Sequence, residues 1–159
     1  GATALVGESN GVEGASHIKD KVIEMMLLNE SLFSCGIACS ASGTETESGN
    51  YLIDMLLANV CKQNVTRFPY EISRLADDIA GGLIVTKPSE KDFKSEEIGK
   101  YCRKYFMGND RFDTLERMKL LRLIENMTLG AAAVGYRTES MHGAGSPQAP
   151  DHDFKTGKA

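Results

Sequence analysis

Twelve residues near the end of the chain, 137–148, carry side chains suited to acid–base chemistry. They include an arginine, a glutamate, a histidine and two nearby glycines, and a very apolar segment leads directly into them. A carboxylate beside a guanidinium stays ionised and can act as a base, whereas burial raises its pKa and suits it to act as an acid. Glu139 is therefore the candidate catalytic residue, and His142 is a conceivable partner. A structural ion pair between Arg137 and Glu139, in a polar loop between two helices, is the alternative.

Two glycine-containing stretches are candidates for close approach of the backbone to a cofactor. Gly81 and Gly82 follow an apolar helical segment, although a plain helix end would explain them equally well. Gly143 and Gly145 precede Ser146, which with the following proline has the form of a helix start. The N-terminus of a helix attracts phosphate or carboxylate, which favours a nucleotide or a coenzyme A phosphate. Neither stretch matches a P-loop or a dinucleotide-binding fingerprint.

A third candidate lies after the most apolar segment of the chain. Residues 62–67 are polar at almost every position, and Gln63 and Arg67 place an amide and a guanidinium where they could hold an anionic cofactor. A solvated helix surface is the alternative interpretation of this stretch.

The spacing of apolar residues predicts four or five helices that position these groups. We expect helices over 16–41, 51–61, 70–80 and 97–106, and one that follows an Asp113 cap, with the two most apolar helices at the centre. Residues 44–50 read as a polar loop, and 83–86 is the only strand-like run, which could equally be an extended connector. In the helix after Asp113, we expect Met118, Leu121 and Ile124 to face inward and Arg117 to face water or a neighbour. The fold class is therefore an all-α helical bundle.

Length and composition restrict the class of protein. A chain of 159 residues favours one domain, and a net charge of −4 with interspersed charges offers no basic stripe for nucleic acid. No apolar run approaches the length that spans a bilayer, so no membrane association is expected. The cysteines Cys35, Cys39, Cys61 and Cys102 lack the close spacing of a metal site. We expect free thiols in a reducing compartment and hence a cytoplasmic protein.

The two ends of the chain suggest a piece of a longer protein. The sequence begins at Gly1 in the middle of an apolar pattern, and the apolar periodicity stops near Gln148. We therefore expect a helical domain at 1–149 and an altered or disordered tail at 150–159.

Specific polar residues throughout the chain also match a known family. The matching stretches are 10–12, 16–21, 28–30, 35–40, 58–64 and 141–148. On these residues the chain closely resembles the family of 4-hydroxybutyryl-CoA dehydratases/vinylacetyl-CoA isomerases over nearly all of 1–149. The wider family includes flavin-dependent 4-hydroxyphenylacetate 3-monooxygenases and shares its architecture with acyl-CoA dehydrogenases.

The resemblance implies an enzyme with FAD and a [4Fe–4S] cluster that dehydrates 4-hydroxybutyryl-CoA to crotonyl-CoA by a radical route and shifts the double bond of vinylacetyl-CoA. It implies a homotetramer whose subunits end in a helical domain, which this chain resembles, with 4-aminobutyrate metabolism as one setting. The family's cluster ligands, three cysteines and a histidine, come from sequence upstream of Gly1. No cluster is therefore expected in this chain, and the chain alone is expected to be inactive.

The resemblance also bears on the candidate residues. Glu139 matches a family active-site glutamate. Gly81 and Gly82 resemble an acyl-CoA dehydrogenase loop that contacts the FAD of a neighbouring subunit, and the loop with Gly143, Gly145 and Ser146 borders the same cofactor region. Two other functions stay open: a flavin-dependent 4-hydroxyphenylacetate 3-monooxygenase-type domain, and a non-catalytic helical oligomerisation module.

Overall fold

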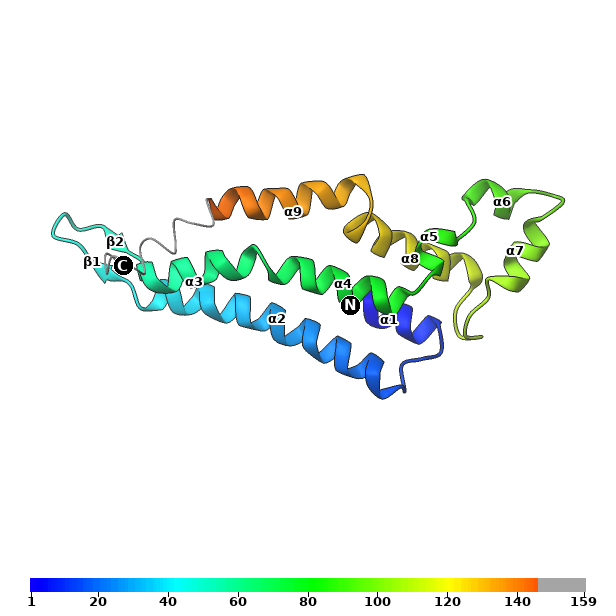
Figure 1. Ribbon diagram of the computed structural model, residues 1–159, viewed down its shortest axis with the longest axis horizontal. Coiled ribbons are helices and arrows are strands. Elements are labelled where there is room, and N and C mark those ends of the chain that lie inside the picture. The colour runs from blue at the N-terminus through cyan, green and yellow to red at the C-terminus, as the bar shows by residue number, and fades with distance from the viewer. Residues whose placement is uncertain (146–159) are drawn as a thin grey trace. The chain divides into compact units, whose positions relative to one another are not determined.

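The computed structural model describes residues 1–145, and these residues are almost entirely helical (Figure 1). The prediction of an all-α domain is confirmed, with more and shorter helices than the sequence suggested. The helices are α1 Ala2–Ser9, α2 Ser16–Ala41, α3 Met55–Val65, α4 Phe68–Ala80, α5 Leu83–Thr86, α6 Glu90–Lys94, α7 Gly99–Tyr105, α8 Thr114–Thr128 and α9 Ala131–Ala144. Strands β1 Thr44–Glu45 and β2 Tyr51–Leu52 form an antiparallel hairpin. The candidate Ser146 and the predicted tail at 150–159 lie outside the described residues.

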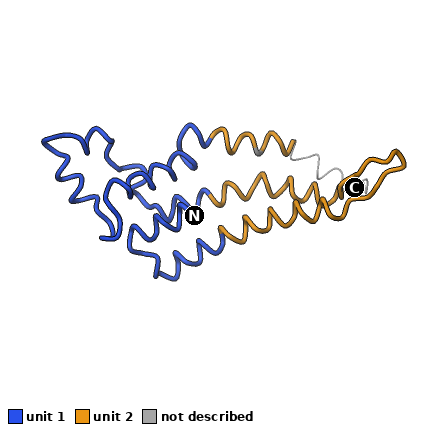
Figure 2. Tube along the Cα trace, turned by 180° about the vertical axis from the view of Figure 1, so that it is seen from behind, with its two compact units in different colours: residues 1–24, 73–133 blue, residues 25–72, 134–159 orange. Residues whose placement is uncertain are grey.

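The described chain divides into two compact units (Figure 2). The first unit contains residues 1–24 and 73–133, and the second contains 25–72 and the residues from 134 onward. The divisions fall inside α2, α4 and α9, so each of these helices contributes residues to both units.

The core of the first unit forms where α1 and α5 pack against α8. Val6 and Leu121 are fully buried there, and Met118 and Ile124 of α8 are almost as well covered. These α8 residues recur at three-residue intervals, which places them on one face of a helix and confirms the predicted inward positions. Asp113 caps α8 as predicted, since its carboxylate accepts a hydrogen bond from the Leu115 amide at 2.8 Å.

The end of α1 is held against the loop that precedes α8. The Ser9 carbonyl accepts a hydrogen bond from the Asn109 amide at 2.8 Å, and a Cβ atom on Gly108 would lie only 2.1 Å from the same carbonyl oxygen. Arg117 is 6% exposed and donates to the Asn10 side-chain oxygen at 2.6 and 3.1 Å and to the Phe106 carbonyl at 2.6 Å. Of the two predicted alternatives, water or a neighbour, the second is realised, because the Arg117 guanidinium donates to these half-buried acceptors.

The second unit contains the hairpin, α3, α9 and the adjoining parts of α2 and α4. Asp54 caps α3 by accepting from the Leu57 amide at 2.8 Å, so the helix predicted over 51–61 begins only at Met55. Tyr51 belongs to the hairpin, and its hydroxyl donates to the Ser40 carbonyl at 2.9 Å. Residues 44–50 were expected as a loop, but 44 and 45 pair with the second strand. Met55 and Leu56 are exposed within this chain, which corrects the expectation that this helix is central.

Three further differences concern short elements. The small residues 2–9 form α1, which the sequence pattern did not predict. Residues 83–86 form the single turn α5 instead of a strand, since Gly82 continues the helical backbone and Thr86 donates its hydroxyl to the Gly82 carbonyl at 3.0 Å. The helix α6 was also unforeseen, although Ser89 and Asp92 form a reciprocal capping box at its start.

One helix in residues 1–145, α2, is long and apolar enough to cross a membrane by length and composition alone. The expectation that no segment approaches that length is thereby corrected. Polar residues such as Glu24 and Glu30 interrupt the apolar run, yet an 18-residue window within the helix remains apolar on average. Core helices of soluble proteins also meet this criterion. The large apolar side chains of α2 that are exposed are Ile23, Met26, Leu27, Phe33 and Ile37.

Candidate functional site

Glu139 lies on α9, where the sequence suggested a polar loop. Its side chain is exposed, and no hydrogen bond or ion pair to another residue in 1–145 involves it. Arg137 is two positions away, and residues two apart on a helix point in different directions. The alternative of a structural Arg137–Glu139 ion pair is therefore not realised. The Glu139 carboxylate is left available to a ligand or to another part of the protein.

Arg137 instead lies against α4 within the second unit. Its guanidinium carbon lies 5.2 Å from the centre of the Tyr70 ring, which is cation–π distance. The Tyr70 hydroxyl donates to the Met141 sulfur at 3.0 Å. The Arg137 Nε atom is buried and has no hydrogen-bond acceptor among the described residues. Because a buried donor without a partner is costly, this N–H is suited to an acceptor from outside residues 1–145. Sequence reasoning missed Tyr70, and no local pattern marks it.

A cavity of about 410 Å³ in the second unit brings α2, α3 and α9 together. Gly143 of α9 lines it, opposite Gly36 of α2 and Ala58 of α3. A Cβ atom on Gly143 would meet no atom within 4 Å, so glycine leaves open space rather than filling a tight contact. Lys62 also lines the cavity, whose surface is almost entirely apolar. The cavity therefore contains one predicted cofactor residue, Gly143, within an apolar surface.

Three thiols lie near this cavity. Cys35 donates to the Leu57 carbonyl and Cys39 to the Asp54 carbonyl, each at 3.5 Å. Burial raises the pKa of the Cys61 thiol, and the neighbouring Cys35 and Cys39 raise it further. All four cysteines of the chain are free. Within residues 1–145, no group of three or more Cys, His, Asp or Glu side chains is arranged to hold a metal ion, so these residues do not fit an iron–sulfur cluster.

The other predicted residues of the second unit do not converge on one point. Gln63 is half-buried and Arg67 is exposed at the end of α3, and neither side chain forms a hydrogen bond with the described residues. Gly145 follows α9 with a φ of 78°, and its amide donates to the His142 carbonyl at 3.1 Å. These residues stay predictions as cofactor ligands.

Gly81 and Gly82 lie in the first unit, whereas Glu139 lies in the second. Gly81 ends α4 with a φ of 68°, a left-handed conformation that favours glycine. Gly82 has a φ of −59° and begins α5. A Cβ atom at either position would meet no atom within 4 Å, so the backbone of this turn is open to approach.

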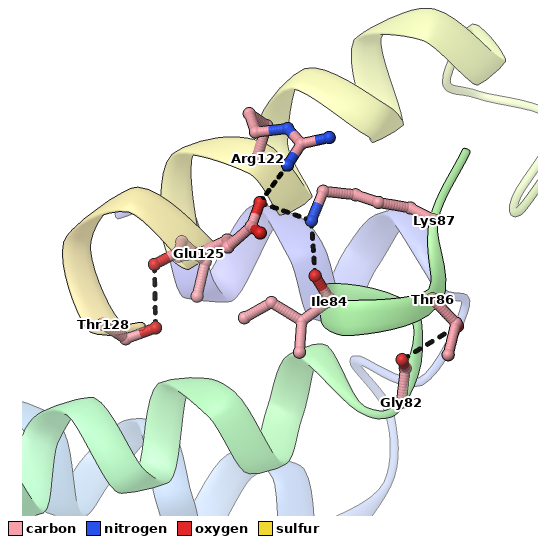
Figure 3. Close-up of polar contacts among 8 residues, drawn as sticks. Gly82, Ile84, Thr86, Lys87, Arg122, Glu125 and Thr128 are labelled. Atoms are coloured by element: carbon pink, nitrogen blue, oxygen red, sulfur yellow. Dashed lines mark hydrogen bonds and ion pairs between the residues drawn. The ribbon is translucent and has the colours of Figure 1, made fainter. Parts of the chain in front are cut away.

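A polar cluster around the buried Lys87 side chain anchors the segment that follows this turn (Figure 3). The Lys87 ammonium donates to the Ile84 carbonyl and, at 2.7 Å, to the Glu125 carboxylate of α8. Arg122 donates to the same carboxylate oxygen. The hydrogen bond from Lys87 and the positive charges of Lys87 and Arg122 hold the pKa of Glu125 below its usual range. The cluster therefore fixes α5 and the Gly82 backbone on α8.

Comparison with known proteins identifies the family. Residues 1–153 match the HpaB family, described as 4-hydroxyphenylacetate 3-hydroxylase C terminal. The chain belongs to this family. Among relatives of the HpaB family, a 4-hydroxybutyryl-CoA dehydratase/vinylacetyl-CoA-Δ-isomerase from Clostridium aminobutyricum is 64% identical over 94% of this chain and 32% of its own length. A 4-hydroxyphenylacetate 3-monooxygenase oxygenase component from Thermus thermophilus is 26% identical over 81% of this chain and 26% of its own length.

Solved structures of HpaB-family proteins share the fold. An oxygen-tolerant archaeal 4-hydroxybutyryl-CoA dehydratase from N. maritimus matches with a TM-score of 0.91 and 61% identity over 97% of this chain and 31% of that one. The oxygenase component of a 4-hydroxyphenylacetate 3-monooxygenase, solved with FAD, matches with a TM-score of 0.86 at 22% identity over 98% of this chain and 33% or less of that one, which supports the fold alone. The chain thus spans about a third of the length of these relatives.

Proposed function

We propose that this chain is the C-terminal helical part of an enzyme that dehydrates 4-hydroxybutyryl-CoA to crotonyl-CoA and isomerises vinylacetyl-CoA. The observation that carries the proposal is the 64% identity to the Clostridium aminobutyricum enzyme, against 26% to the monooxygenase component from Thermus thermophilus. The reaction needs groups that take a proton from a carbon of the acyl chain and give a proton to the departing hydroxyl.

Glu139 supplies the titratable carboxylate for one of these proton transfers. It is exposed on α9 and engaged by no residue in 1–145, so its carboxylate is available to a substrate. Contact with the apolar part of an acyl chain would exclude water from the carboxylate, so that it could exchange a proton directly with the substrate. His142, one helical turn further along α9, could exchange that proton with solvent.

FAD, when bound, supplies the redox chemistry of the route. In this chain the buried Arg137 Nε–H without an acceptor and the open backbone at Gly143 fit a ligand that carries acceptors. We propose that the cofactor also approaches the backbone at Gly81, Gly82 and Gly145. Polar contacts with the cofactor would come from Gln63, Arg67 and Ser146. The [4Fe–4S] cluster of the proposed enzyme would take its ligands from sequence outside this chain, and we derive no step through it.

The proposal extends to the assembly. The exposed apolar residues of α2 support a homotetramer in which other parts of the enzyme cover them. Four free cysteines suit a cytoplasmic protein, and degradation of 4-aminobutyrate is a pathway that generates 4-hydroxybutyrate derivatives.

The test is the Glu139→Gln variant of the full-length enzyme that contains this chain. Formation of crotonyl-CoA should fall by about 10²- to 10⁴-fold, the usual contribution of a positioned acid–base group, while the bound flavin absorbance stays unchanged. Glu97→Gln removes a carboxylate that is also exposed and should leave turnover unaltered. Retained turnover in the Glu139 variant would refute its role.

The runner-up function is a flavin-dependent 4-hydroxyphenylacetate 3-monooxygenase, which the family description favours. Full-length protein that hydroxylates 4-hydroxyphenylacetate and lacks iron–sulfur absorbance would establish it in place of the dehydratase. A non-catalytic oligomerisation module would instead show no quenching of flavin fluorescence at high protein concentration.

A further inference from the structure

A second cavity, of about 370 Å³, lies in the first unit and contains none of the residues assigned above. It is bounded by α6, α7, α8 and the connection from α5 to α6. Phe93 and Met118 form part of its lining and are each less than 10% exposed, and Leu115 and Pro88 add further apolar surface. A volume of a few hundred Å³ with an apolar lining falls within the usual range for pockets that take small organic ligands.

Basic side chains surround this apolar lining. Lys87, Lys94, Arg103, Lys119 and Arg122 contribute to it, against one acidic lining residue, Glu90. Three of these cations are already engaged, since Lys87 and Arg122 pair with Glu125, and Lys94 pairs with Glu90.

Arg103 and Lys119 remain without a carboxylate at ion-pair distance among residues 1–145. Arg103 donates one N–H to the Phe93 carbonyl at 3.2 Å, which orients the guanidinium and leaves its other donors unused by this chain. The Lys119 ammonium makes no hydrogen bond with the described residues. Its positive charge lowers the pKa of Glu90, although Lys94 has the larger effect on that carboxylate. Two cations from different helices therefore have no carboxylate at ion-pair distance in the described part of the chain, which leaves them available to an anionic ligand.

We propose that this cavity binds an organic phosphate with a flat apolar body, of the adenosine phosphate class. Arg103 and Lys119 would hold phosphate oxygens by charge-assisted hydrogen bonds, and the surface of Phe93, Leu115 and Met118 would contact the apolar body. The volume exceeds what a bare inorganic anion needs. Adenine nucleotides and the phosphorylated adenosine end of coenzyme A share this chemistry. The proposal does not depend on the proposed dehydratase function, because it rests on this cavity alone.

The test measures binding by isothermal titration calorimetry with ADP, coenzyme A and inorganic pyrophosphate. Pyrophosphate matches the two phosphates of ADP and lacks the apolar body. ADP or coenzyme A should bind, and pyrophosphate should bind at least about tenfold more weakly, since the apolar surface contributes only to the first two. Tighter binding of coenzyme A than of ADP would identify coenzyme A as the source, and equal binding would identify adenine nucleotides.

Lys119→Glu should weaken binding of the preferred ligand by about tenfold, the effect of one lost charge-assisted contact. Because the Lys119 side chain makes no hydrogen bond within this chain, the substitution should leave the melting temperature unchanged. Lys104→Glu is the matched control, since it makes the same charge change at an exposed position of α7 outside the cavity. Absence of binding, equal binding of pyrophosphate, or equal weakening by both variants would overturn the proposal.

Discussion

The ammonium group of Lys87 lies 2.7 Å from the carboxylate of Glu125, and the Lys87 side chain is only 2% exposed. The ammonium also donates to the Ile84 carbonyl, so two of its donors are satisfied inside the protein. A buried charge without a partner is far more costly than a paired one. This pair therefore holds the segment after the Gly82 turn on α8, and the geometry of that turn depends on it.

Glu125→Gln should lower the free energy of unfolding by about 2 kcal/mol, because it leaves the Lys87 charge buried without its counter-charge. The value is set below the range for fully buried pairs, since a quarter of the Glu125 side chain is exposed. Urea denaturation followed by circular dichroism measures it. Glu116→Gln on the same helix removes an exposed carboxylate and should change stability by less than about 0.5 kcal/mol. Equal losses in both variants would contradict a specific role for the pair.

The same pair predicts a dependence of stability on pH. The pKa of Glu125 is lower in the folded protein than its ordinary value of 4.5, chiefly because Lys87 donates a hydrogen bond to it. Its contribution to stability should therefore be complete above about pH 4.5 and be lost as the pH falls through the folded pKa. Other carboxylates, such as Asp78, also titrate with lowered pKa values, so the difference between the wild type and Glu125→Gln isolates this one. That difference should be constant from pH 7 to about pH 5 and shrink below it.

Gly81 and Gly82 should respond differently to alanine. Gly81→Ala places a side chain at a φ of 68° and should cost about 1–2 kcal/mol. Gly82→Ala has a φ of −59° and open space at Cβ, so stability should change by less than about 0.5 kcal/mol. In the full-length enzyme, Gly82→Ala should nevertheless weaken FAD binding if the backbone of this turn approaches the cofactor. Unchanged flavin affinity would remove Gly82 from the cofactor residues.

Arg117→Met should destabilise the protein by about 3 kcal/mol, because it removes the buried guanidinium and leaves the half-buried acceptors of Asn10 and Phe106 without donors. Arg111→Met is the control. Arg111 pairs with Glu8 and Glu13 at the surface with half of its side chain exposed, and such pairs contribute at most about 1 kcal/mol. Thermal unfolding measures the stability of both variants, and the loss should be larger for Arg117→Met, whose side chain is buried, than for Arg111→Met, whose side chain is exposed.

Local signals in the sequence predicted most of the long helices. The predicted start of α2 at Ser16 is correct. Asp113 directly precedes α8, and its carboxylate accepts a hydrogen bond from the Leu115 amide, because capping side chains satisfy amides that the helix itself leaves free. Periodicity predicted the buried face of α8 for the same local reason. Arg117 lies on that helix, and the sequence left open whether it faces water or a neighbour, because its acceptor on Asn10 lies 107 residues away. Hydrogen-bond partners this far apart in the sequence cannot be predicted from the periodicity of a dozen neighbouring residues.

Short elements were predicted less well. Residues 83–86 are β-branched or apolar and read as a strand, yet no strand pairs with them in the described chain, and the backbone after Gly82 continues in the helical region. For the candidate site, residue types alone were enough to propose Glu139 and Gly143, but they gave no sign of Tyr70 or of the cavity lined by Arg103 and Lys119. The position of Tyr70 beside Arg137 depends on packing between α4 and α9, and the cavity depends on packing among α6, α7 and α8. Local sequence patterns do not encode either arrangement.

The close contact of Gly108 with the Ser9 carbonyl has a consequence for synthesis on the ribosome. The acceptors at the end of α1 emerge about a hundred residues before their donors, since Asn109 and Arg117 follow Glu8 and Asn10 by 101 and 107 positions. Until translation has passed residue 117, the first helix has no native partner from α8, and its apolar face is open to chaperones or to misassociation. A nascent chain stalled just before Gly108 should thus be degraded by added protease at α1, whereas one stalled well beyond α8 should resist.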